Sequence, residues 1–235
     1  MGEAAERFQT KREVAIARMK DAILLGRYRP GQLLRQVQLM ADLGLGATPA
    51  REAALELVAR GLLVHESHRG VRVADVDPER AAQVYQVRAL LEAEAARLAA
   101  RGADDAVVAQ LTRHVEAMER ACAAGDRKRL AVADERFHRL LAERAGNPVL
   151  TRQIEQLWEL FPRYMLWRKR ERVAESLREH RLILRHIARR DADAAAAAVC
   201  AHILHGLDAL AAILREQPRR DEKPPCDDEH REDVR

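Results

Sequence analysis

The chain contains few aromatic residues and few cysteines. Trp, Tyr and Phe together make up 3% of its 235 residues, while Ala, Leu, Arg and Glu are abundant, which favours helices over strands. Three cysteines, Cys122, Cys200 and Cys226, lie far apart and form no CxxC pair. This spacing excludes a disulfide framework and a zinc knuckle, so we expect three reduced thiols.

Long apolar segments are also missing. No apolar run approaches the ~20 residues that a membrane span needs. The N-terminus has no apolar signal core. We therefore expect a cytoplasmic protein with no membrane contact.

Basic residues are concentrated in the first third of the chain. Residues 1–74 contain 12 Lys and Arg against 8 Asp and Glu, and the remaining residues contain 29 of each sign. The net charge of +4 therefore comes entirely from the N-terminal part. Such an excess suits a module that binds a polyanion.

The N-terminal pattern predicts a winged helix-turn-helix over residues 1–74. Helical spacing indicates helices over residues 11–25, 35–43 and about 48–60, and Gly44 and Gly61 end the second and third. Alternating valines follow over residues 62–76, which predicts a β-hairpin whose tip carries His68 and Arg69 before a turn at Gly70. The stretch GLGATPAREAA is then the turn and the first half of a recognition helix.

The same reading predicts which residues contact DNA. Thr48 and Arg51 lie on the helix face away from the buried alanines, and first-turn side chains of a recognition helix reach base edges. Arg35 lies at the start of the second helix, and His68, Arg69 and Gly70 form the wing tip, so we expect phosphate or minor-groove contacts there. The alternative is a protein-interaction module in which Arg51 is a solvated charge.

The pattern of the remaining chain predicts helices. A polar linker covers residues 75–80, and a bundle of about six helices covers residues 81–216, with breaks near 101–102, 125–126, 146–148, 169–172 and 190–193. Pro162 should kink the fourth helix. Residues 217–235 carry charge runs and three prolines, which predicts a disordered tail. The fold class is therefore mainly α.

Four residues of the bundle have spacings that fit one metal site. Asp134 and His138 are four apart and share a helix face. His180 and His202 each lie 11 residues from Asp191, so an antiparallel hairpin with its turn there places both at the same height. Each histidine alone is more often a core or surface residue than a ligand. Together, three imidazoles and one carboxylate suit Zn²⁺, Ni²⁺ or Mn²⁺.

The motifs resemble a known family. The run from IL-x-G-x-Y-x-PG-x-x-L through TPAREAALELVARGLL, over roughly residues 14–74, resembles the DNA-binding domain of the GntR family of bacterial transcriptional regulators. Residues 79–215 resemble the helical FCD domain of its FadR/VanR-like branch, in which D-x-x-x-H and two later histidines hold a divalent metal. The resemblance implies that Arg88 faces an effector cavity, with Arg163 as a second anchor. The alternative is that Arg88 lies on the surface and forms an i, i+4 ion pair with Glu92.

These observations together predict a metabolite-responsive repressor. It would bind a palindromic double-stranded DNA operator as a homodimer and sense a small carboxylate effector at the metal. A metal-dependent enzyme and a helical scaffold with a structural metal are the alternatives. We do not expect enzymatic activity, because the sequence shows no general base or nucleophile at the spacing of a known catalytic motif.

Overall fold

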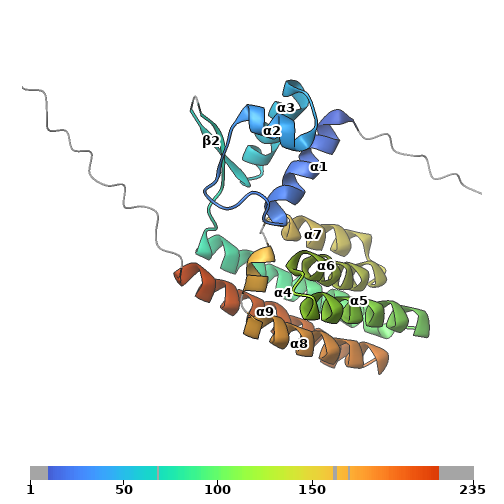
Figure 1. Ribbon diagram of the computed structural model, residues 1–235. Helices are drawn as coiled ribbons and strands as arrows, with labels where there is room; N and C mark the ends of the chain where they lie inside the picture. Colours follow the sequence, from blue (N-terminus) through green and yellow to red (C-terminus); the bar gives the residue numbers. More distant parts are fainter. Residues whose placement is uncertain (1–9, 68, 161–162, 169, 217–235) are drawn as a thin grey trace, which may run out of the picture.

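The computed structural model describes residues 10–67, 69–160, 163–168 and 170–216, and it has an N-terminal domain beside a helical bundle (Figure 1). The N-terminal domain contains α1 (Lys11–Leu24), β1 (Leu33–Leu34), α2 (Gln36–Leu43), α3 (Ala47–Ala59), β2 (Leu63–Glu66) and β3 (Gly70–Val73). Thr10 begins α1 with a capping box closed by Glu13, and Gly44 ends α2 in the left-handed conformation. The predicted winged helix-turn-helix is confirmed.

The wing contains one strand more than the sequence predicts. β3 pairs with β2 and also with β1, so the sheet has three antiparallel strands in the order β1-β3-β2. A strand of two residues is too short to show alternation, which is why the pattern missed it. Apolar side chains of the helices and strands form one core, centred on Met19, Leu34 and Leu57.

In the residues that the structure describes, the bundle contains six α-helices, in agreement with the predicted number. They are α4 (Pro78–Arg101), α5 (Asp105–Ala123), α6 (Arg127–Arg144), α7 (Pro148–Trp158), α8 (Arg170–Ala188) and α9 (Ala192–Arg215), with a short 3-10 helix η1 (Arg163–Arg168) between α7 and α8. Most begin at an acidic or amide side chain that accepts a backbone N–H, as Asp104, Asp126, Asn147 and Asp191 do. These caps explain the positions of the helix breaks.

The long helices α4 and α9 pack along each other in the bundle core. Small residues let them approach closely: a Cβ at Gly206 of α9 would lie 3.3 Å from the Tyr85 ring of α4, a tighter contact than most. By length and hydropathy alone, α9 could cross a membrane, which corrects the expectation that no segment approaches such a span. In the structure its buried face instead contributes Val199, His202 and Leu210 to the interior of the bundle.

The segment after α7 differs from the prediction. The fourth helix was expected to continue to about residue 169 with a kink at Pro162, but α7 ends at Trp158 and η1 follows. A proline disfavours helix in the residue before it, so Pro162 limits how far α7 could extend but does not set its end at Trp158. Pro162 itself, His68 and the tail 217–235 lie outside the described residues.

Candidate metal centre and nucleic-acid interface

The residues predicted to contact DNA lie on the surface of the N-terminal domain. Arg35 precedes α2, Thr48 and Arg51 lie at the start of α3, and Arg69 lies in the turn before β3, all of them exposed. Gly46 supplies no side-chain cap to α3, so the first backbone N–H groups of this helix remain available to a phosphate. His68, predicted beside Arg69, is outside the described residues.

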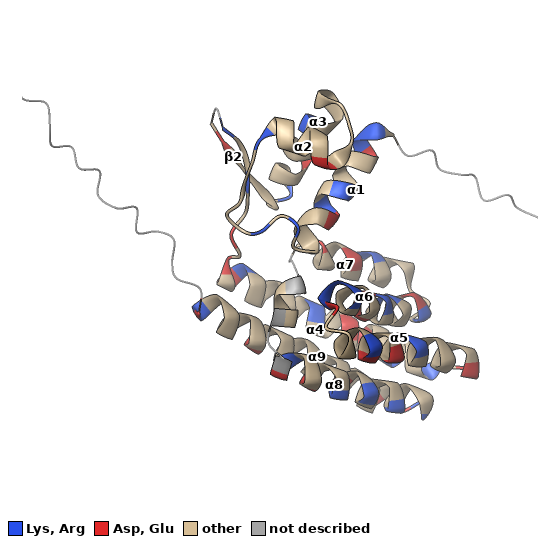
Figure 2. Ribbon diagram, in the orientation of Figure 1, with Lys and Arg blue, Asp and Glu red and all other residues tan. Residues whose placement is uncertain are grey.

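Some arginines of this domain pair with acidic residues, and in the described part of the chain others do not. Arg12 and Arg60 pair with Glu56, and Arg72 pairs with Glu66. Arg35, Arg51 and Arg69 form no ion pair with any acidic residue in the described part of the chain. In Figure 2, Lys and Arg appear on α1 and the wing together with some acidic residues, and both signs are scattered over the bundle. Three unpaired cations therefore remain available for an anionic partner.

Gly70 has a structural role at the wing. Its φ is +118°, a region that L side chains rarely adopt, and a Cβ there would lie 2.5 Å from the backbone oxygen of Leu34. This close approach brings β3 against β1. The packing of the sheet is therefore sufficient to explain why position 70 is a glycine.

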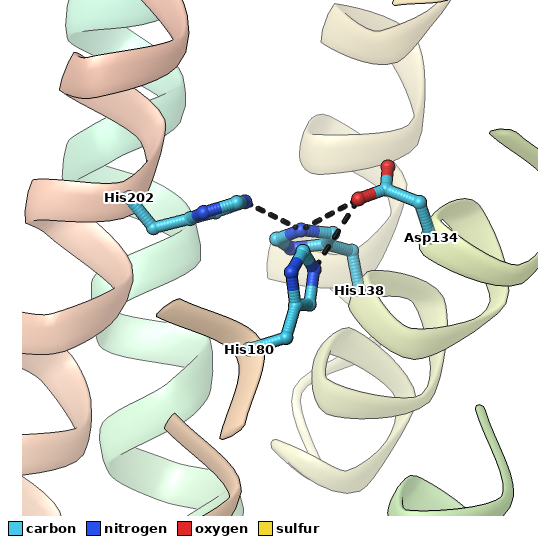
Figure 3. A group of neighbouring side chains, drawn as sticks. All are labelled: Asp134, His138, His180 and His202. Atoms are coloured by element: carbon cyan, nitrogen blue, oxygen red, sulfur yellow. Dashed lines mark hydrogen bonds and ion pairs between the residues drawn. The ribbon is translucent and has the colours of Figure 1, made fainter. Parts of the chain in front are cut away.

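The structure brings Asp134, His138, His180 and His202 together in the core of the bundle (Figure 3). Asp134 and His138 come from α6, His180 from α8 and His202 from α9, and all four side chains are buried. One ligand atom of each lies within 4.8 Å of those of the others. Nε2 of His138 lies 3.2 Å from Nε2 of His202, and Nε2 of His180 lies 3.2 Å from Oδ1 of Asp134.

The other nitrogen of each histidine lies close to an oxygen acceptor. Nδ1 of His138 lies 3.1 Å from Oε2 of Glu92, and Nδ1 of His202 lies 2.6 Å from Oε2 of Glu179. Nδ1 of His180 lies 2.7 Å from the backbone oxygen of Ser176. Such outer partners fix the tautomer and the orientation of metal-ligating histidines.

This arrangement fits a cation. Carboxylate and carbonyl oxygens only accept, so they favour a proton on each Nδ1, and in a neutral ring with that tautomer Nε2 is free to bind a cation. Burial, with the nearby His180 and His138, lowers the pKa of His202 to about 3, which keeps this ring neutral. The Nε2 atoms of the three rings thus lie close to one another and to the carboxylate of Asp134, a set of donors that a divalent ion can bind. Nε2 of His180 is buried without a hydrogen-bond partner.

Two buried arginines support the carboxylates behind the cluster. Nε of Arg88 donates to Oε1 of Glu92 at 2.8 Å, and Nη1 of Arg172 donates to Oε2 of Glu179 at 3.0 Å. Burial would raise the pKa of Glu92, but the charge of Arg88 and the contact with His138 lower it. Burial would also raise the pKa of Glu179, but the contacts with His202 and Arg172 lower it to about 2.

A small cavity of about 20 Å³ adjoins the cluster. Its polar lining includes Arg88, Asp134, His138, Arg172 and His202. About 10–15 Å³ suffices for one water molecule, so the cavity is smaller than an organic acid. The surface Arg88–Glu92 pair considered from the sequence exists as a pair, but its two side chains are only 4% exposed. Arg88 lines the cavity, and its predicted role toward an effector stays a prediction.

Several supporting residues escaped the sequence analysis. Ser176 lies four residues before His180, a spacing that could have indicated the contact. Glu179 and Arg172 gave no comparable signal, because their contacts to His202 cross between α8 and α9. The side chain of Arg163, predicted as a second anchor, lies outside what the structure describes.

Comparison with known proteins decides the family. The family model "Bacterial regulatory proteins, gntR family" matches residues 11–73, and the FCD domain model matches residues 83–205. The chain belongs to the GntR family of transcriptional regulators and carries an FCD domain. DNA binding and transcription regulation follow from this membership.

Characterised relatives and solved structures agree with the family. The Nta operon transcriptional regulator of Aminobacter aminovorans is 31% identical over 80% of this chain and 89% of its own. The HTH-type transcriptional repressor GlaR of Escherichia coli is 29% identical, over 79% of this chain and 89% of its own. The structure of Escherichia coli McbR/YncC matches with a TM-score of 0.77 at 22% identity, covering 88% of this chain and 99% of that one. This last likeness shows the shared fold.

Proposed function

We propose that this GntR regulator is a repressor controlled by a divalent ion and a small carboxylate effector. The observation that carries the proposal is the convergence of three histidine Nε2 atoms and Asp134, with every Nδ1 already engaged by an acceptor. Asp134, His138, His180 and His202 would hold Zn²⁺, Ni²⁺ or Mn²⁺. The ion supplies a positive charge that can bind a carboxylate.

Arg88 and Arg172 would complete the effector site. Both line the cavity beside the cluster, and an arginine can bind a carboxylate through paired N–H groups. Each already donates to a glutamate, so an effector would share these donors. Because the cavity holds little more than a water molecule, an organic acid must displace some of its walls. That displacement gives binding a way to alter the bundle.

The N-terminal domain would bind a palindromic operator as part of a homodimer in the cytoplasm. Thr48 and Arg51 would reach base edges, while Arg35 and Arg69 would contact phosphate or the minor groove. Two symmetric half-sites need two recognition helices, which is why the proposal includes a dimer. The effector would act by favouring a dimer geometry that no longer matches the half-site spacing.

Metal analysis and calorimetry test this function first. Wild-type protein stripped with a chelator should take up one divalent ion per chain, and His180→Ala should bind it far more weakly. DNA binding by His180→Ala should survive, since the N-terminal domain has its own core. Equal ion uptake by the two proteins would exclude this cluster as the site. Catalytic turnover by the ion-loaded protein would instead favour the metalloenzyme alternative.

A further inference from the structure

The C-terminal end of α7 contacts the supports of the candidate metal cluster. Trp158 is the last residue of α7, and its buried indole N–H donates to Oε1 of Glu92 at 2.9 Å. The second oxygen of Glu92 lies 3.1 Å from Nδ1 of His138. A single carboxylate therefore separates Trp158 from a candidate metal ligand.

The next residue, Glu159, faces the DNA-binding domain. Its carboxylate pairs with Lys20 of α1 and lies 3.3 Å from Nη1 of Arg60. Arg60 directly follows the last residue of α3, the recognition helix, and caps it. In the described residues these ion pairs join the two domains. Figure 1 shows α7 beside α1 at this junction.

We propose that Trp158 and Glu159 are positioning residues that couple the metal centre to the DNA-binding domain. The proposal rests on the function proposed above. A shift of Glu92 on ion binding would move Trp158, and Glu159 would move with it because the two are adjacent at a helix end. Glu159 would then change the position of Arg60, and with it the orientation of α3. The metal centre and the DNA-binding domain would then both act on the same junction between the domains, as energetic coupling of two sites requires.

The exposed character of the junction suits this role. The side chains of Lys20, Arg60 and Glu159 are 21%, 41% and 34% exposed. Ion pairs this accessible contribute little to folding. Their removal should therefore leave both domains folded and alter only the communication between them.

Hydrogen exchange of the full chain, with Zn²⁺ as the probe, tests the coupling. In the wild type, Zn²⁺ should slow amide exchange in the bundle and also in α1 and α3, by about fivefold in the latter two. Glu159→Gln should keep the zinc affinity and the bundle response but lose the response of α1 and α3. Trp158→Phe keeps an aromatic ring and removes the N–H donor. It should also weaken the response of α1 and α3.

Glu116→Gln is the matched control. Glu116 is an exposed glutamate of the bundle that pairs with Arg120 of its own helix, α5, so this variant should respond as the wild type does. A full response of α1 and α3 in Glu159→Gln would overturn the proposal. So would zinc binding to the wild type with no response in α1 or α3. Calorimetry on the same samples separates these outcomes from a wild type that binds no zinc, which would refute the metal site and this coupling together.

Discussion

Nε2 of His138 lies 3.2 Å from Nε2 of His202, although the two residues are 64 positions apart in the chain. The opposite nitrogen of each ring is held by a carboxylate, from Glu92 and Glu179 respectively. In the neutral tautomer that these carboxylates favour, the proton of each ring lies on Nδ1 and neither Nε2 has one to share. The pair is arranged to present two lone pairs to a third, positively charged partner.

Removing the charge behind His202 should weaken metal binding. In Glu179→Gln we expect the affinity for Zn²⁺ to fall about 10–100-fold, the usual effect of losing an outer partner of a ligating histidine. Glu175→Gln is the control, because Glu175 contacts the same Arg172 but no metal-cluster histidine. Calorimetry at a fixed pH gives both affinities. Equal affinities in the two variants would show that Glu179 does not support the ligand.

Arg51→Ala should weaken operator binding by at least about tenfold, since a charged contact to phosphate or guanine contributes about 1–3 kcal/mol. The side chain is exposed at the start of α3 and, in the described residues, has no acidic partner. Arg120→Ala removes the same charge from an exposed position in the bundle and should have little effect. Gel-shift titration at fixed salt compares them. Unchanged affinity in Arg51→Ala would remove this residue from the interface.

Gly70→Ala should disrupt the wing and lower operator affinity. The added Cβ would meet the Leu34 oxygen at 2.5 Å with φ at +118°, and backbone strain of this kind costs about 1–3 kcal/mol. Gly46→Ala is the control: its φ is −68° and nothing lies within 4 Å of the added Cβ. Thermal unfolding measures the stability of both variants, and we expect the lower unfolding temperature for Gly70→Ala. Equal unfolding temperatures would contradict the close approach of β1 and β3.

Much of the fold could be predicted from the sequence because its helix ends carry strong local signals. Asp126, Asn147 and Asp191 cap helices at the predicted breaks. The same regularity brought His180 and His202 together: equal distances from one turn place two residues level across a helical hairpin. Their ring centroids lie 4.5 Å apart in the structure.

Features that depend on contacts between distant segments could not be predicted. β1 is a strand only because β3 pairs with it. Whether Glu179 reaches His202 depends on how α8 and α9 are rotated about their axes, which no spacing within one helix reveals. The early end of α7 at Trp158 likewise has no strong local stop signal, since Pro162 stands four residues beyond it.

We propose that a small carboxylic acid controls DNA binding through the metal cluster. The decisive experiment measures operator binding by the zinc-loaded protein in the presence of such acids. Fluorescence anisotropy would follow an operator selected from random DNA, with a panel of such acids added to wild type and to His180→Ala. The account predicts that at least one acid changes the operator affinity of the zinc-loaded wild type by about fivefold or more. It predicts no change in His180→Ala or in chelator-treated wild type. An acid that alters the affinity equally in all three samples would contradict control through the Asp134, His138, His180 and His202 cluster.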